Sequence, residues 1–250
     1  YTYFTWRHTK HELTEYMNEL TRSEVREYLR PNFFPNTPDI LPTFLQTGGR
    51  PAFMIRFVLA STLSSVYGIY NGFELCENAA IPGREEYNNS EKYDYKVWDW
   101  NRPGNIKDYI KRINRLRREN PALQELDNLT FCAASHDDVL FYGKMTADRR
   151  NMVFVAVNLN PFDVREADVE FPLGELGVGT DGGFEVEDLL SGERHRWWGA
   201  WQHLRLDRPR RCHDQQHCGQ RHDRHQRASK IRSSVANQTG PQRSKRLPNA

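Results

Sequence analysis

Apolar side chains recur at helical spacing shortly after the start of the chain. Thr9 and Glu12 are placed so that each side chain can bond the other's backbone amide, a pattern that begins helices. The apolar positions that follow share one face of a helix; they are Leu13, Tyr16, Met17 and Leu20. The sequence therefore predicts an amphipathic helix over about residues 10–20.

Extended and helical patterns alternate up to about residue 120. The predicted strands cover residues 1–6, 25–33 and 66–70, and the predicted helices cover residues 51–65 and 106–120. This alternation is typical of βα units on a parallel sheet, which places the region in the α/β class. Three such units cannot close a barrel, but they fit the last three units of an eight-unit barrel.

A different pattern starts near residue 128. Short apolar segments are separated by Asp, Asn, Gly and Pro, and no long helical pattern lies between them. The predicted strands cover residues 129–134, 139–145, 152–159, 164–171, 184–190 and 201–207. We therefore divide the folded part into an α/β region, residues 1–127, and an antiparallel β-sandwich domain, residues 128–207.

Residues 208–250 form a basic tail of low apolar content. They carry eleven Lys or Arg against two Asp, so the net charge of +2 combines an acidic body with a basic tail. Such a segment cannot bury enough apolar surface to offset the entropy of ordering, and we predict that it is disordered. Because no aromatic residue follows Trp201 to stack on a base, we expect no nucleic-acid partner.

The tail also contains six side chains able to bind zinc: Cys212, His213, His217, Cys218, His222 and His225. Structural zinc sites favour closely spaced Cys pairs joined by a folding segment, whereas five residues separate Cys212 from Cys218 in a segment without helix or strand pattern. We favour a solvated tail over a metal site. The four cysteines of the chain are too sparse for a disulfide framework, so we expect a cytoplasmic protein.

Residues 51–70 are the best candidate for a membrane span, but Arg56 and several hydroxyl side chains interrupt the apolar run. We predict a buried helix followed by a strand there, and no membrane partner. The sequence contains no metal-binding helix motif, phosphate-cradling glycine loop or nucleophile elbow, and we expect no cofactor.

Two prolines fix the backbone around a single acid in the stretch "NFFPNTPDIL", residues 32–41. Pro35 and Pro38 lock φ and remove two amide donors, so the stretch is neither a helix interior nor a central strand. The sequence predicts a stiff loop that carries Asp39. A surface turn, in which the Asp side chain bonds its own backbone, is the commoner explanation for such a stretch.

Five stretches of the chain together resemble the α-amylase family: "YTYFTWR", "VREYLRPNFFPNTPDIL", "GGRPAFMIRFVLASTLSSVYGIYNGFELCEN", "SEKYDYKVWDW" and "RINRLRRENPALQ". The similarity covers residues 1 to about 207, and within the family it is to enzymes that transfer maltosyl units from α-maltose 1-phosphate to the ends of α-1,4-glucans. It implies that residues 1–127 are the C-terminal portion of a (β/α)8 TIM barrel and that a β-sandwich follows. It further implies a homodimeric full-length protein.

The resemblance also assigns candidate site residues. Asp39 matches the third carboxylate of a retaining site, which stabilises an oxocarbenium-like transition state. Lys92 and Tyr93 match a pair that contacts the sugar of the donor. The nucleophile and the general acid/base match positions before Tyr1, so we expect this chain alone to be inactive. The tail departs from the family, and a coding frameshift near residue 207 would explain the departure.

Two other functions stay open at this stage. An α-glucan hydrolase of the same superfamily differs in whether water or a glucan hydroxyl accepts the sugar. A non-catalytic glucan-binding module would use Trp6, Trp98 and Trp100 as stacking surfaces, although packing in a core is the commoner use of such rings.

Overall fold

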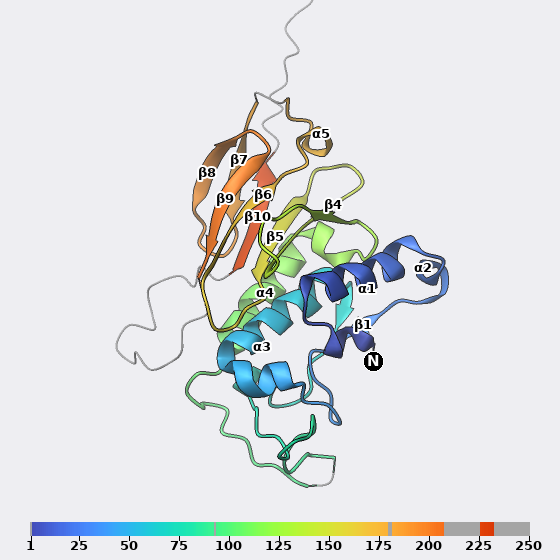
Figure 1. Cartoon of the computed structure of the whole chain (residues 1–250), viewed down its shortest axis with the longest axis vertical. Coiled ribbons are helices and arrows are strands. Elements are labelled where there is room, and N and C mark those ends of the chain that lie inside the picture. The colour runs from blue at the N-terminus through green and yellow to red at the C-terminus, as the bar shows by residue number, and fades with distance from the viewer. Residues whose placement is uncertain (1, 93, 180–181, 208–225, 233–250) are drawn as a thin grey trace, which may run out of the picture.

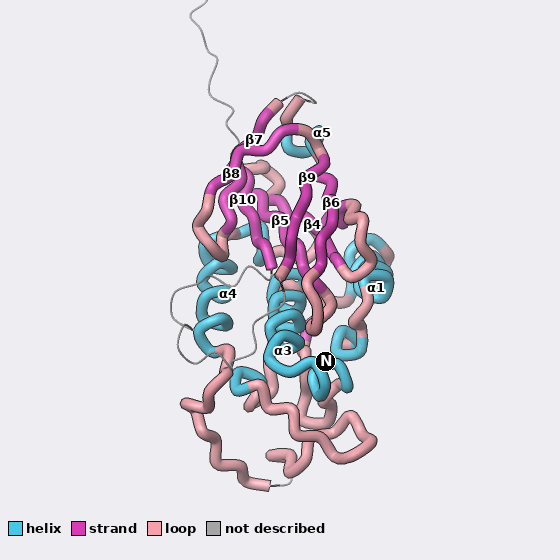
Figure 2. The backbone as a smooth tube through the Cα atoms, turned by 60° about the vertical axis from the view of Figure 1, so that its left-hand side comes forward, coloured by secondary structure: helices cyan, strands magenta, loops and turns pink. Residues whose placement is uncertain are grey.

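A computed structural model describes residues 2–92, 94–179 and 182–207, together with the backbone of residues 226–232. The strands of the second half of the chain gather at one end of the molecule, and the long helices lie in the middle (Figure 1). Irregular loops of residues 76–105 occupy the opposite end, beyond the helices (Figure 2). Among the described helices, none is both long enough and apolar enough to cross a bilayer.

The first predicted helix is confirmed as α1, Lys10–Arg22. Its capping box forms as expected, because the Thr9 hydroxyl accepts a bond from the Glu12 amide at 3.2 Å and the Glu12 carboxylate accepts one from the Thr9 amide at 3.0 Å. The apolar stripe is buried, with Leu13 and Met17 fully inside the core. Capping and periodicity together therefore determine this element.

The predicted strand over residues 1–6 is wrong, because Tyr3–Trp6 forms a 3-10 helix, η1. The ring of Phe4 stacks on Phe33 at 4.4 Å between centroids, and the Thr5 hydroxyl donates to the Phe34 carbonyl at 2.8 Å. Of the aromatic residues in this segment, Phe4 thus packs in the core, whereas Tyr3 remains 66% exposed. The strand over residues 25–33 is correct only at its end.

The segment after α1 contains a short helix, α2, Val25–Tyr28, and then the two-residue strand β1, Asn32–Phe33. Strand β1 pairs in parallel with β2, Val66–Tyr67, and the long helix α3, Thr43–Leu63, connects them. The described residues therefore contain two parallel strands in this region, whereas the sequence pattern predicted three.

Helix α3 begins earlier than the sequence predicted. A kink at Gly49, which has a φ of 58°, divides it, and the predicted helix over 51–65 corresponds to the part after the kink. Pro51 occupies the first turn of that part, where a missing amide donor costs little. Helix α4, Lys107–Glu119, is confirmed and ends before Asn120-Pro121. Short 3-10 helices occur at Phe73–Leu75, η2, and Pro121–Gln124, η3.

All six predicted strands of the second region are confirmed to within two residues. They are β3, Leu129–Cys132, β4, Val139–Met145, β5, Met152–Asn158, β6, Arg165–Glu170, β7, Gly183–Asp188, and β9, Trp201–Leu206. A seventh strand, β8, Arg194–Trp198, was not predicted because its charged residues conceal the alternation. A short helix, α5, Leu173–Leu176, follows β6.

The strand β10, Gln226–Arg232, corrects the prediction of a wholly disordered tail. It pairs antiparallel with β5 and β7, so that Ala228 lies opposite Val155 and Ser229 opposite Asp188. The prediction from composition considered only how much apolar side-chain surface the tail can bury. Strand β10 is instead held by backbone hydrogen bonds to two strands that would otherwise be edge strands. The rest of residues 208–250 lies outside the described residues.

The strands form a six-stranded sheet, ordered β3-β4-β5-β10-β7-β8, and a two-stranded sheet of β6 and β9. Side chains of β4 and β5 alternate between two cores. One set, which includes Phe141 and Phe154, packs between the two sheets and forms the inter-sheet core. The other set, which includes Leu140 and Val155, packs against the helices and forms the helix-side core.

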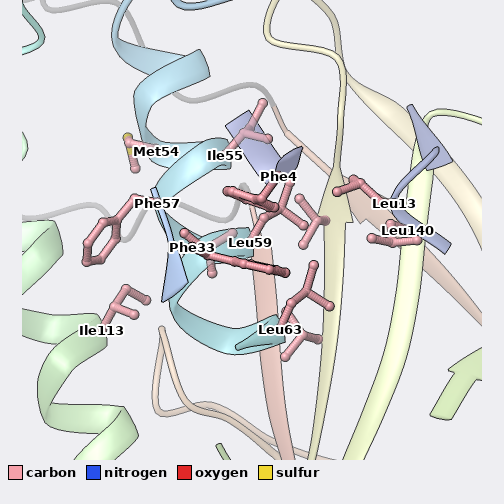
Figure 3. Packing of buried hydrophobic residues seen from close by; sticks show 14 of the residues in the cluster. Phe4, Leu13, Phe33, Met54, Ile55, Phe57, Leu59, Leu63, Ile113 and Leu140 are labelled. Atoms are coloured by element: carbon pink, nitrogen blue, oxygen red, sulfur yellow. The ribbon is translucent and has the colours of Figure 1, made fainter. Parts of the chain in front are cut away.

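The helix-side core joins the two regions of the chain. Phe57 of α3 faces Ile113 of α4, whereas Phe4 lies on the side of Leu13 and Leu140 (Figure 3). The six-stranded sheet is thus covered by helices on one face and by the two-stranded sheet on the other (Figures 1 and 2). Because β4 and β5 are buried on both faces, they read as continuous apolar runs.

Candidate active site

Asp39 lies in a tight turn that follows strand β1. The backbones of Thr37 and Ile40 exchange two hydrogen bonds, with amide-to-carbonyl distances of 3.0 and 3.2 Å. The Asp39 amide donates to the Thr37 hydroxyl at 3.2 Å. Together with Pro35 and Pro38, these bonds hold the backbone of the turn that carries Asp39, where the sequence predicted a stiff loop.

A buried amide anchors this turn to the rest of the molecule. Asn36 is fully buried, its carbonyl oxygen accepts a bond from the Tyr70 amide at 3.0 Å, and its amide nitrogen donates to the Tyr87 hydroxyl at 2.7 Å. Burial raises the pKa of Tyr87, so this phenol stays protonated. The turn is thereby tied to two segments that lie far away in the sequence.

Lys92 comes from the irregular segment and meets Asp39 at the turn. Its ammonium group forms an ion pair with the Asp39 carboxylate, and the two side chains are 45% and 55% exposed. The Ser90 hydroxyl supports this approach by donating to the Pro38 carbonyl at 3.1 Å. The structure therefore brings together two of the three residues that sequence analysis singled out, while Tyr93 lies outside the described residues.

The turn borders a depression with a volume of about 440 Å³. Its lining offers carboxylate, amide, hydroxyl and ammonium groups, from Asp39, Asn88, Ser90, Lys92 and Asp94 among others. These groups are able to hydrogen-bond the hydroxyls of a sugar. Since the Asp39–Lys92 pair is half exposed, we expect it to contribute little to stability and to open readily for a ligand.

The tryptophans proposed as stacking surfaces differ in environment. Trp98 lines a second depression of about 320 Å³, and its indole nitrogen donates to Glu91 at 2.8 Å. Trp6 and Trp100 remain 41% and 47% exposed. Asn88 and Asn89 line both depressions, so the two hollows adjoin each other.

Sequence analysis missed two polar residues that position the site. One is Asn36, and the other is Glu85, whose carboxylate accepts bonds from the Thr43 amide at 2.7 Å and from the Trp6 indole at 3.2 Å. Glu85 thus satisfies an unpaired amide at the start of α3, directly after the Asp39 turn. Its partners are about 40 and 80 residues away in sequence, so the residues next to Glu85 in the chain cannot indicate this role.

In the described part of the chain, no group of three or more His, Cys, Asp or Glu side chains is arranged to hold a metal ion. The six zinc-binding candidates of the tail fall in residues 208–225, outside the described residues.

Both the sequence and the fold of the chain are similar to those of known proteins. The family described as "GLGE, C-terminal" matches residues 131–214. The chain is 60% identical over 207 residues to an α-1,4-glucan:maltose-1-phosphate maltosyltransferase of Rhodospirillum rubrum, and 51% identical over 207 residues to one of Pseudomonas aeruginosa. Over most of its length, the chain is similar in sequence to these maltosyltransferases. Each alignment covers 83% of this chain and 30% or 31% of the maltosyltransferase.

The chain therefore spans about a third of the length of the curated maltosyltransferases it matches. Solved structures agree with the relationship at the level of the fold. The α-amylase of Geobacillus thermoleovorans, complexed with acarbose, matches 92% of this chain and 46% of its own, with a TM-score of 0.64 and 15% identity. An Anoxybacillus α-amylase matches 92% of this chain and 44% of its own, with a TM-score of 0.60 and 13% identity.

Proposed function

We propose that this chain is part of a retaining transferase that moves maltosyl units from α-maltose 1-phosphate to the non-reducing ends of α-1,4-glucans. The observation that carries the proposal is the 60% identity over 207 residues with a maltosyltransferase, in a stretch that includes most of the chain. The ion pair of Asp39 and Lys92 beside a polar depression supports it, since these are the described residues expected to face the sugar.

The proposed architecture follows from the same relationship. Residues 1–127 contribute the C-terminal portion of a (β/α)8 barrel, in which β1 and β2 are neighbouring parallel strands, and residues 128–207 form the sandwich domain. In such barrels, active sites lie at the C-terminal ends of the strands. Asp39 has that position relative to β1, because it follows the strand in the first loop.

Each candidate residue has a distinct role in the proposed reaction. Asp39 hydrogen-bonds to hydroxyls of the reacting sugar and favours the oxocarbenium-like transition state. Lys92 forms an ion pair with the Asp39 carboxylate before the donor enters, and then, with Tyr93, contacts the donor sugar. The nucleophile and the general acid/base, about 5 Å apart in retaining enzymes, come from parts of the enzyme that correspond to positions before Tyr1.

We further propose that the enzyme requires no cofactor, that the full-length protein is a homodimer, and that it acts in the cytoplasm on soluble substrates. The choice between transfer and hydrolysis depends on whether a glucan hydroxyl or water accepts the maltosyl group. That choice is made at the acceptor side of the site, to which segments outside this chain contribute.

A chimera tests the proposal directly. This chain replaces the matching part of the Rhodospirillum rubrum maltosyltransferase, and phosphate release from α-maltose 1-phosphate is measured with and without glycogen. We expect release that depends on glycogen, with lengthened glucan as the product. Release of phosphate and free maltose without glycogen would favour a hydrolase, and binding of glucan without turnover would favour a non-catalytic module.

A further inference from the structure

Strands β8 and β9 meet at a corner that presents two tryptophans to solvent. Trp198 ends β8 and is 61% exposed, and Trp201 begins β9 and is 53% exposed. Gly199 and Ala200 alone separate them, so their Cα atoms lie at most about 11 Å apart. The two strands belong to different sheets, and the corner therefore lies where the six-stranded and two-stranded sheets adjoin.

The corner is fixed by contacts that do not involve the exposed rings. Trp197 points the other way, into the inter-sheet core, and lies 5.4 Å from Phe171 between ring centroids. The Gln202 side chain donates to the Trp198 carbonyl at 2.8 Å, and the Phe171 amide donates to the Ala200 carbonyl at 2.8 Å. The exposed indoles are therefore held on a rigid backbone and lose little freedom when a ligand binds.

Neighbouring residues support the Trp198 ring, although this residue is 61% exposed. The indole lies across Gly183 of the neighbouring strand, where an added Cβ would come within 2.9 Å of its ring nitrogen. The guanidinium of Arg196 lies 5.6 Å from the ring centroid. A flat, supported apolar ring with polar neighbours is suited to the C–H face of a sugar, whose hydroxyls then reach the flanking side chains.

The charges around the corner are balanced. On the outer face of β7 and β8, Arg196 lies opposite Glu185, and Arg194 lies 3.7 Å from Glu187. On the outer face of β6 and β9, Arg205 pairs with Glu166 at 2.7 Å. Balanced charge gives little attraction for nucleic acid or an acidic peptide. A protein partner needs about 800 Å² on each side, whereas here two indoles stand among charged pairs.

We propose that the Trp198–Trp201 corner is a second binding site for an α-1,4-glucan chain, separate from the Asp39 depression. This inference rests on the proposed function, which makes a neutral glucan the acceptor of the enzyme. Asp39 lies between β1 and α3, and Lys92 lies between η2 and α4. The corner instead belongs to strands β8 and β9, which lie at the end of the molecule opposite the irregular loops (Figures 1 and 2). The corner would retain the polymer while the active site extends its end.

Binding of maltoheptaose and retardation in glycogen-containing gels test the site in the full 250-residue chain. We expect Trp198→Ala and Trp201→Ala each to raise the Kd about tenfold, equal to about 1.4 kcal/mol. Trp198→Phe keeps a ring over Gly183 and should have a smaller effect. Tyr28→Ala removes a ring that is 77% exposed on α2 and should leave binding unchanged.

Unchanged binding in both Trp198→Ala and Trp201→Ala would overturn the inference, as would a wild-type chain that binds no glucan. Loss of binding in Asp39→Asn alone would also overturn it, because the depression would then be the binding site. If Trp198→Ala fails to fold, the Kd values of Trp201→Ala and Trp198→Phe still test the inference. The proposed function is tested by phosphate release from the chimera, which does not use these variants. Failure of the proposed function can therefore be distinguished from failure of the second binding site.

Discussion

The helix-side core and the inter-sheet core share strands β4 and β5 but differ in what they bury. Aromatic rings fill the centre of the inter-sheet core, where Phe171 contacts Phe141, Phe154, Phe184 and Trp197 at 5.0–5.5 Å between centroids. The helix side instead encloses two fully buried cations, Arg56 and Lys144. The stability contributed by apolar packing depends on how well side chains fit together, whereas the free-energy cost of a buried titratable group depends on pH. The two cores should therefore respond to different perturbations.

The largest effect is expected from a cavity in the inter-sheet core. Phe171→Ala removes the ring that touches the four others and should lower the free energy of unfolding by about 3–5 kcal/mol. Because the loss is one of packing, it should be the same at pH 7 and pH 9 in urea titrations. Phe171→Leu should cost clearly less, and a cost that varied strongly with pH would contradict the assignment of charge to the other core.

A pH-dependent gain is expected on the helix side. Burial lowers the pKa of Lys144 from 10.5 to about 7, and its amino group donates to the Glu125 carbonyl at 2.5 Å. Between pH 7 and 10.5 the unfolded chain binds a proton that the folded chain does not. The free energy of unfolding should therefore rise with pH across this window.

Lys144→Met should remove that rise and increase the free energy of unfolding at pH 7 by on the order of a few kcal/mol. The gain should shrink as the pH approaches 10.5, where the wild-type lysine is neutral in both states. Lys111→Met, on the exposed face of α4, serves as the control and should leave the pH profile unchanged. An unaltered profile in Lys144→Met would show that Lys144 is not the group that titrates.

A smaller loss is expected where the helices meet the sheet. The Thr62 hydroxyl of α3 and the Tyr142 hydroxyl of β4 lie 2.6 Å apart, and both are buried. Thr62→Val should cost about 1–3 kcal/mol because it leaves the Tyr142 hydroxyl without this partner. The double variant with Tyr142→Phe should recover much of the loss, and simple additivity in that cycle would refute the coupling.

The smallest effect is expected at the start of α1, away from both core centres. Thr9→Ala removes one half of the capping box and should lower the free energy of unfolding by about 1 kcal/mol. Thr9→Ser retains the hydroxyl and should be close to wild type. Equal stability of Thr9→Ala and wild type in urea would indicate that α1 is held by its buried stripe alone.

Much of the fold could be predicted because local patterns determine it. The capping box of α1, the apolar runs of β4 and β5, and the stop at Asn120-Pro121 each follow from residues within one element. Where tertiary contact decides, prediction failed. Phe4 favours a strand by type but packs as part of a 3-10 helix against Phe33, and β10 exists through pairing with distant strands.

The site shows the same division. The flanking prolines and the family resemblance identified Asp39 as a candidate, and the resemblance identified Lys92. No local pattern indicated that the two side chains, 53 residues apart in sequence, form an ion pair. Asn36 and Glu85 were missed because an Asn or Glu in a loop is ordinary until its partners are known. Residues that match a family pattern are thus easier to find from sequence than the residues that hold them in position.

The most direct test of the account is the kinetic role of Asp39 in the chimera with the Rhodospirillum rubrum maltosyltransferase. We predict that Asp39→Asn lowers kcat/KM for phosphate release by about 10²–10³ or more, because a group that acts in the transition state is lost. Asp108→Asn, at an exposed acid in the first turn of α4, is the control and should stay near wild type. Near-normal turnover by Asp39→Asn, with the fold intact, would contradict the proposed role.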